Sequence, residues 1–333
     1  MDSLRKALKE LTQSASPVGI LTHINPDGDG FCAALFMAKW LSLHEVDSMI
    51  VTDGDDLALF EHLLADAQVQ PYHPEMSFAT LLILDCNNIA RLGERKDLLD
   101  KASQVYLIDH HEVEVGLIPA QYSFIEQSFV SVGAILFEAL EAQLQGLPPD
   151  VLTYLASCLY TTILNDTNTF TNGNTTAIVL DQAARMAALG ANPSLLHRQY
   201  FQNQSWQEIR YTGEVLGTTQ VYEGGKVLLL YSTLQMAEDN GIIPADVLNV
   251  TRWVQGVRGI EAVIFIREES PGYFKLSFRS KKVDVSRFAA RYGGGGHSNA
   301  SGCHLQGELN QIKQMILDDF IQVYREIDAQ QAQ

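Results

Sequence analysis

The fold follows from one stretch near the N-terminus, Thr22-His23-Ile24-Asn25-Pro26-Asp27-Gly28-Asp29-Gly30. A short apolar run, Val18 to Leu21, precedes it, and the apolar run from Phe31 to Met37 that follows predicts a helix. The stretch therefore lies at the C-terminal end of a predicted first strand, where α/β sheets place their binding sites. Its imidazole and two carboxylates are crowded together, and carboxylates this close repel each other unless a cation or a proton lies between them. We therefore expect a metal ion at this strand end.

Three further runs predict strands of the same sheet: residues 47–51, 79–85 and 104–109. Two of them are almost continuously apolar and end in an acid, which is typical of a strand that is buried on both faces. One of these two, residues 104–109, ends at Asp109 and leads directly into His110 and His111. Helical patterns separate the strands, so we expect a parallel sheet with helices on both sides and polar side chains along one edge.

Composition and charge exclude several classes of protein. The 333 residues are 46% hydrophobic and 19% charged, which indicates a folded chain long enough for two domains. The N-terminus is not typical of a signal peptide, no apolar run has the length of a membrane span, and the four cysteines lack paired spacing. These features predict a cytoplasmic protein without disulfides or membrane contact.

The formal net charge of -17 argues against a general electrostatic grip on long DNA. It does not exclude nucleotides, because an acidic cluster that holds divalent ions becomes locally positive. Between residues 252 and 291 there are nine Lys or Arg and four Asp or Glu, so that this segment carries 9 - 4 = +5. The positive charge of this segment is explained about equally well by solvent-exposed strand faces and by a face that binds phosphate.

The second half of the chain restarts with strands. Runs rich in β-forming residues occupy 226–231, 262–267 and 273–279, and a short predicted helix leads into the loop Gly293-Gly294-Gly295-Gly296-His297. We predict a catalytic domain at 1–190, a helical linker at 191–215 and a second, smaller α/β domain with a mixed sheet at 216–333. The four glycines are either a flexible turn or a backbone that lets amides approach a phosphate.

A lone His or Asp at a strand end is usually a cap or a turn residue. Here six such side chains reach one sheet edge from four elements, and they are His23, Asp27, Asp29, Asp85, His110 and Asp166. Carboxylates and imidazoles without a thiolate suit Mn, Mg or Fe better than structural zinc. Two ions bridged by a carboxylate can generate hydroxide and clamp a phosphoryl group, and Asp85 is the best candidate for the bridge. His111 either packs internally or donates to a phosphate oxygen.

These residues carry a family resemblance. The motifs are His23-Ile24-Asn25-Pro26-Asp27-Gly28-Asp29, Asp85, Asp109-His110-His111 and Asp166. Together they resemble the four motifs of the DHH phosphoesterase superfamily, and the glycine run before His297 resembles the motif of its DHHA1-containing branch. That branch includes RecJ-type exonucleases, cyclic-dinucleotide phosphodiesterases and nanoRNase/pAp-phosphatase proteins. Length and layout most resemble the last group.

The resemblance implies a parallel-sheet DHH domain, a helical linker and a DHHA1 domain, with the active site in the cleft between the domains. One Mn²⁺ site would use His23, Asp27 and Asp85, and the other would use Asp29, Asp85, His110 and Asp166. Asp109 would orient a ligand imidazole, and His111 would contact the substrate phosphate. Mg²⁺ or Co²⁺ could substitute for Mn²⁺. The substrate-binding residues of the second domain would be Arg279, Ser280, Gly295, Gly296, His297 and Ser301.

The predicted function is therefore a Mn-dependent phosphodiesterase that hydrolyses short single-stranded oligonucleotides, nanoRNA or linear dinucleotides, to mononucleotides, with pAp as a further substrate. The alternatives are an exopolyphosphatase or pyrophosphatase and a non-catalytic nucleotide sensor. An exposed apolar helix could mediate a homodimer. Two positions depart from the family pattern: Gly30 stands where Ala is frequent, and Asn168 stands where Gly is usual.

Overall fold

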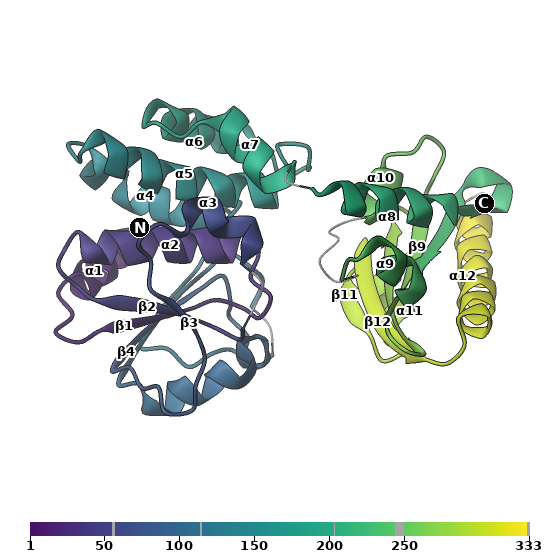
Figure 1. Cartoon of the computed structure of the whole chain (residues 1–333), viewed down its shortest axis with the longest axis horizontal. Coiled ribbons are helices and arrows are strands. Elements are labelled where there is room, and N and C mark those ends of the chain that lie inside the picture. Colours follow the sequence, from purple (N-terminus) through teal and green to yellow (C-terminus); the bar gives the residue numbers. More distant parts are fainter. Residues whose placement is uncertain (55–56, 114, 203, 244–249, 332–333) are drawn as a thin grey trace. The chain divides into compact units, whose positions relative to one another are not determined.

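The computed structural model describes residues 1–54, 57–113, 115–202, 204–243 and 250–331. It forms two compact units, Met1–Asn203 and Gln204–Gln333, which Figure 1 shows in purple to teal and in green to yellow. The division between them falls within the predicted linker segment, residues 191–215. In the described part of the chain, no helix is long and apolar enough to cross a membrane.

The first unit contains a six-stranded sheet in which every neighbouring pair is parallel. Its strands are β1 (Val18–Leu21), β2 (Ser48–Thr52), β3 (Val69–Pro71), β4 (Thr80–Leu84), β5 (Gln104–Asp109) and β6 (Tyr122–Ile125). Its helical segments are α1 (Asp2–Leu11), α2 (Gly28–Ser42), η1 (Ala58–Phe60), α3 (Glu61–Leu64), η2 (Ile89–Lys101), α4 (Val132–Leu144), α5 (Pro149–Asp166), α6 (Ala177–Ala188) and α7 (Pro193–Phe201). The predicted parallel sheet is confirmed.

The strand order β3-β2-β1-β4-β5-β6 places the site. The chain leaves β1 toward β2 on one side and later returns to pair β4 on the other, so the order reverses between β1 and β4. Ligands of such sheets bind beyond the carboxyl ends of the strands at this switch point. His23 follows β1 and Asp85 follows β4, and both therefore lie at the switch point.

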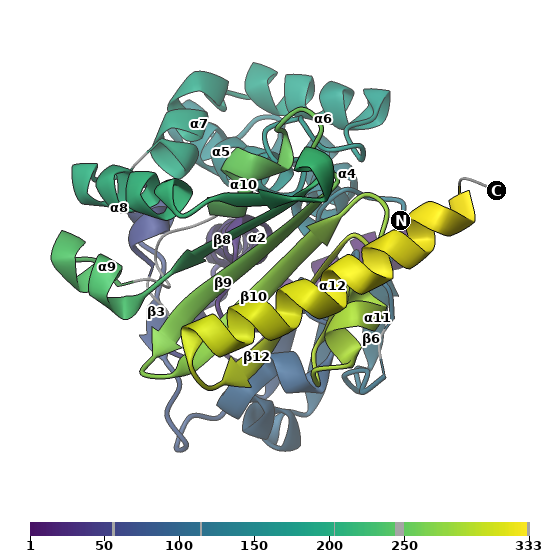
Figure 2. The ribbon, with the colours of Figure 1, turned by 90° about the vertical axis from the view of Figure 1, so that its right-hand side faces the viewer.

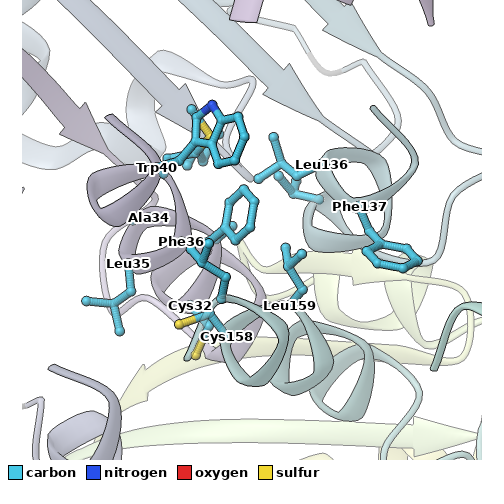
Figure 3. Packing of buried hydrophobic residues seen from close by; sticks show 14 of the residues in the cluster. Cys32, Ala34, Leu35, Phe36, Trp40, Leu136, Phe137, Cys158 and Leu159 are labelled. Carbon is cyan, nitrogen blue, oxygen red and sulfur yellow. The ribbon is translucent and has the colours of Figure 1, made fainter. Parts of the chain in front are cut away.

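Side chains alternate between two cores along the central strands. Leu82 and Leu84 of β4 belong to the core under α2, α4 and α5, whereas Leu81 and Ile83 belong to the core on the opposite face. Figure 3 shows Phe36 and Trp40 of α2 packed against side chains of α4 and α5 in the first of these cores. Burial on both faces holds the strand ends, and with them the polar side chains that follow, in fixed positions.

Sequence patterns did not predict β3 and β6. Both lie at the sheet edges, where β3 is only three residues long and β6 has no fully buried residue. An edge strand with one covered face lacks the continuous apolar run by which the four central strands were recognised.

The second unit has a six-stranded mixed sheet in the order β11-β12-β10-β9-β8-β7. Its strands are β7 (Gln220–Tyr222), β8 (Val227–Ser232), β9 (Ala262–Ser270), β10 (Tyr273–Ser280), β11 (Gly295–His297) and β12 (Ala300–Gln306). Its helical segments are α8 (Trp206–Gly217), η3 (Glu223–Gly225), α9 (Leu234–Asn240), α10 (Val250–Gln255), α11 (Val285–Ala290) and α12 (Leu309–Gln331). Strands β8 and β9 are parallel and the other pairs are antiparallel, which confirms the predicted mixed sheet.

Helices also cover both faces of this second sheet. Helix α12 runs across the strands on one face (Figure 2), where Ile316 and Phe320 pack into the core. Tyr211 and Val215 of α8 pack into a separate core on the other face. One prediction for this unit is corrected: the glycine run is not wholly a loop, because Gly295–His297 forms β11 and pairs with β12.

Candidate metal centre

The first set of candidate ligands gathers beyond β1. His23 directs Nδ1 to the carbonyl of Ile24, 2.8 Å away, so that Nε2 faces the site. Nε2 lies 3.5 Å from Oδ2 of Asp85 and 3.8 Å from Oδ1 of Asp27. Asp27 is the N-cap of α2, and its Oδ1 accepts hydrogen bonds from the amides of Asp29 and Gly30. The chain thus fixes these three side chains before any ligand binds.

The second set gathers around His110, just beyond β5. Its Nε2 lies 3.2 Å from Oδ2 of Asp166, at the end of α5, and 3.5 Å from Oδ2 of Asp29, in the first turn of α2. The ligand atoms of these three residues all lie within 4.8 Å of one another, as do those of His23, Asp27 and Asp85.

Asp85 lies between the two sets. Its Oδ2 faces His23, while its Oδ1 lies 3.5 Å from Nε2 of His110 and 3.3 Å from Nδ1 of His111. The residue is 1% exposed and has a φ of 59°, a left-handed conformation that Asp tolerates better than most residues. A carboxylate that offers one oxygen to each of two ligand sets has the geometry of a bridge between two ions.

The pKa values of the side chains in the two ligand sets indicate that both sets favour bound cations. Burial and the neighbouring carboxylates raise the pKa of Asp29 well above its usual range, and burial raises the pKa of Asp166 to about 6. Burial alone would lower the pKa of His23, but Asp27 and Asp85 outweigh it and raise that pKa to about 10. The site therefore has a strongly negative potential, which favours any bound positive charge.

The donors fit divalent metal ions. Oδ1 of Asp85 and Nε2 of His110 are buried, and neither has a hydrogen-bond partner among the described residues. Buried polar atoms without partners are costly, and coordination to an ion would satisfy both. Cys86 belongs to none of the candidate ligand groups found among the described residues, and its thiol donates to the carbonyl of Asn88. Nitrogen and oxygen donors suit Mn²⁺ or Mg²⁺, as predicted, although the identity of the ion stays a prediction.

The N-terminus of α4 holds Asp29, a contact that sequence reasoning did not find. The amide of Val132 donates to Oδ2 at 2.7 Å and the amide of Gly133 donates to Oδ1 at 3.1 Å. Helix N-termini stabilise carboxylates in this way. Ser131 is the N-cap of this helix, and its Oγ accepts a hydrogen bond from the amide of Ala134.

Gly133 also lets α4 approach α5 closely. A Cβ at this position would lie 2.0 Å from Oγ1 of Thr162, in a fully buried contact. We expect Gly133→Ala to lower the free energy of unfolding by about 1–3 kcal/mol through overpacking, measured by denaturant unfolding. Gly213→Ala in α8 is the matched control, because a Cβ there meets nothing within 4 Å. Equal stability of the Gly133→Ala protein and the wild type would contradict the prediction.

Asp109 bonds to the two histidines that follow it. Its Oδ1 accepts hydrogen bonds from the amides of His110 and His111, and it lies 2.9 Å from Nδ1 of His111. Asp109 therefore orients His111, the predicted phosphate contact. One ligand atom each of Asp85, Asp109, His110 and His111 lie within 4.8 Å of one another, and the predicted role of Asp109 toward the His110 ring stays a prediction. The side chain of His111 is 40% exposed, whereas that of His110 is 14% exposed.

A polar chain that sequence reasoning missed orients Asp166. Nδ2 of Asn165 donates to Oδ1 of Asp166 at 2.8 Å, and the hydroxyl of Tyr200, in α7, donates to Oδ1 of Asn165 at the same distance. The Tyr200 hydroxyl also lies so close to Gly28 that a Cβ there would be 2.5 Å from it. Contacts between residues this far apart in sequence leave no local pattern.

We expect Asn165→Ala to weaken the affinity of the His110–Asp166 set for Mn²⁺ about tenfold, because partners that orient a ligand typically contribute this much. Calorimetric titration with Mn²⁺ measures the effect. Asn172→Ala is the control, since within the described part of the chain the one partner of its Nδ2 is the backbone carbonyl of Asp166. A loss of the same size in both variants would contradict a role specific to the Asp166 carboxylate.

The backbone of the turn after Asp166 explains why Asn can stand at position 168, where the family pattern usually has Gly. Asn168, Thr169 and Phe170 have φ values of 48°, 59° and 63°, all in the left-handed region. Glycine adopts this conformation freely, and Asn is among the residues that tolerate it best. Gly30 is the other position that differs from the family pattern, in which Ala is frequent. A Cβ at Gly30 would lie 3.2 Å from Oδ2 of Asp85.

The predicted substrate contacts of the second unit lie around the end of β10. Arg279 and Ser280 line an open pocket of about 650 Å³, together with Lys281, Ser298 and Asn299. Burial lowers the pKa of Arg279, and its Nη1 donates to the carbonyl of Phe278. Their role in binding substrate stays a prediction.

The other predicted contacts of this unit have structural roles or lie in β11. The hydroxyl of Ser280 accepts from the amides of Lys282 and Val283, and that of Ser301 donates to the carbonyl of Val285. Gly295 and Gly296 pair with β12, and the side chain of His297 lies outside the described part of the structure.

Comparison with known proteins agrees with this geometry. The model of the DHH family N-terminal domain matches residues 17–163, and that of the DHHA1 domain matches residues 226–326. The chain belongs to the DHH/DHHA1 phosphoesterases. It is therefore a metal-dependent hydrolase, with the DHH motifs in the first unit and the DHHA1 domain in the second.

Several relatives are similar along nearly the whole chain. The bifunctional oligoribonuclease and PAP phosphatase NrnA of Mycoplasma pneumoniae is 26% identical over 306 residues, 90% of this chain and 91% of that protein. NrnA of Thermus thermophilus is 27% identical over 323 residues, 95% of this chain and 93% of that protein. A solved exopolyphosphatase-related protein of Bacteroides fragilis has the same fold, with a TM-score of 0.85, 20% identity and coverage of 98% and 96%.

Proposed function

We propose that this chain is a Mn-dependent phosphodiesterase that hydrolyses short single-stranded oligonucleotides to mononucleotides and also removes a phosphate from pAp. The observation that carries the proposal is the position of Asp85, which offers one carboxylate oxygen to the His23–Asp27 pair and the other to His110. The curated relatives of similar length are named for these two activities, which supports the substrate class.

The two proposed ions would share Asp85. His23 and Asp27 would complete the set that holds the first ion, and Asp29, His110 and Asp166 would complete the set that holds the second. Such a pair supplies Lewis-acid activation of water and charge stabilisation on phosphoryl oxygens. RecJ of Thermus thermophilus, which has this fold with a TM-score of 0.54, 16% identity and coverage of 96% of this chain and 55% of that one, was solved in complex with Mn²⁺.

The remaining residues bind and orient the substrate in this proposal. Asp109 holds the ring of His111, which can then donate a hydrogen bond to a phosphate oxygen. Arg279 suits a terminal phosphate, since a guanidinium binds two phosphate oxygens at once. The net charge of -17 disfavours long polyanions that must contact a large surface, and so it favours short substrates.

One assay tests the function. Purified protein with Mn²⁺ is offered a 5′-phosphorylated dinucleotide, pAp, a cyclic dinucleotide and polyphosphate in parallel, with Asp166→Ala as the control variant. We expect mononucleotides from the linear dinucleotide, phosphate from pAp and neither product from Asp166→Ala. If the protein hydrolyses polyphosphate alone, the alternative function as an exopolyphosphatase is favoured. If it binds nucleotides without turnover, the alternative function as a non-catalytic nucleotide sensor is favoured.

A further inference from the structure

Arg91 links the two loops that carry His23 and Asp85. It lies in the first turn of η2, and its amide bonds to the carbonyl of Asn88 at 3.1 Å. Its carbonyl accepts a hydrogen bond of 2.8 Å from the amide of Ile24, the residue after His23. The backbone of Arg91 is thus one hydrogen bond away from the first ligand set.

The segment that carries Arg91 is held rigidly. The fully buried guanidinium of Arg95, which follows the kink at Gly93 in η2, donates to the carbonyls of Val51 and Leu92 and pairs with Asp53. These contacts fasten η2 to the end of β2. An arginine held on such a segment needs little reorganisation to bind a ligand.

Arg91 lies beside the loops that carry the first ligand set. Its backbone bonds both to Asn88, three residues after Asp85, and to Ile24, the residue after His23. Arg91 is half-buried, so it retains contact with solvent.

Most cations of the first unit are already engaged by other groups. Those with an ion pair or a side-chain hydrogen bond are Arg5, Lys6, Lys39, Arg95, Lys101 and Arg185. Arg91 makes neither through its side chain within the described residues, even though residues 1–203 carry 10 Lys or Arg and 25 Asp or Glu, a net charge of 10 - 25 = -15. An unpaired guanidinium in so acidic a unit is available to an external anion.

We propose that Arg91 binds a phosphate oxygen of the nucleotide that lies against the His23–Asp27–Asp85 set. It is then a specificity-determining residue of the catalytic unit itself, separate from Arg279 in the second unit. This inference rests on the proposed function, because it takes the anion to be a phosphate ester. A fixed guanidinium offsets part of the repulsion that a phosphate meets when it approaches a unit of net charge -15.

The test compares Arg91→Ala and Arg91→Lys with Lys96→Ala, which removes another cation of η2 that has no partner among the described residues. Hydrolysis of a 5′-phosphorylated dinucleotide is measured, together with the number of Mn²⁺ ions bound. We expect kcat/KM to fall about 10- to 100-fold in Arg91→Ala, as for a lost charge-assisted hydrogen bond. Arg91→Lys should recover part of the loss, and Mn²⁺ stoichiometry should not change.

Three results would overturn the inference: a kcat/KM within threefold of wild type in Arg91→Ala, an equal loss in Lys96→Ala, or loss of a Mn²⁺ ion. Should the wild type hydrolyse no nucleotide, the proposed function fails but the inference is still tested by calorimetry of inorganic phosphate binding to the Mn-loaded protein. Binding at least tenfold weaker in Arg91→Ala would support it, and equal binding would overturn it.

Discussion

Asp85→Asn is expected to reduce hydrolysis of a short oligonucleotide at least about 1,000-fold. The side chain keeps its shape but loses the charge that both ligand sets share, and a pair of ions contributes several kcal/mol to the transition state. At about 1.4 kcal/mol for each factor of ten, a loss of about 4 kcal/mol gives this reduction in kcat. Steady-state kinetics at saturating Mn²⁺ measures it.

The matched control for this substitution is Asp100→Asn, which removes the same charge from an exposed position of the same unit. Its activity should equal that of the wild type. Activity of the Asp85→Asn protein within tenfold of the wild type would show that Asp85 does not join two ions. Circular dichroism of both variants separates a loss of function from a loss of folding.

Removal of metal is expected to have the second large effect. Protein treated with a chelator should be inactive and should regain activity with Mn²⁺, because the ions would supply the Lewis-acid activation of water. Removal should also destabilise the site, because the crowded carboxylates lose the cations that offset their repulsion. Mn²⁺ at 100 times its Kd should stabilise the first unit by about 2.7 kcal/mol for each ion. For a unit of this size the melting temperature should rise by about 5–10 °C for each ion.

Differential scanning calorimetry with and without Mn²⁺ measures this rise, and Asp85→Asn again supplies the control. That variant should show a much smaller increase in melting temperature at the same Mn²⁺ concentration. Full activity after exhaustive chelation, or an unchanged melting temperature on addition of Mn²⁺, would contradict a metal-dependent site.

The sequence predicted the parts of the fold that repeat a local pattern. The apolar runs before His23, Asp85 and Asp109 indicated central strands, and parallel strands bring their carboxyl ends to one edge. Six candidate ligands therefore meet where they were expected. The edge strands β3 and β6 and the pairing of β11 leave no such pattern, since neighbours in space determine them.

The supporting contacts were missed for the same reason. Asp29 bonds to the amides of Val132 and Gly133, more than 100 positions away in the chain. The hydroxyl of Tyr200 reaches Asn165 across 35 positions. Periodicity and spacing report only on neighbours along a helix or a strand. Residues that orient ligands thus become visible only once the tertiary structure brings α4, α5 and α7 to the site.

The central claim is that two ions bind side by side and share Asp85. The most direct test is the number of Mn²⁺ ions bound by each molecule, measured by the loss of the free Mn²⁺ signal in electron paramagnetic resonance during titration. We predict two ions for the wild type and one each for His23→Ala and Asp166→Ala, because each substitution removes a donor from a different set. A single ion in the wild type, or two ions in both variants, would contradict the account.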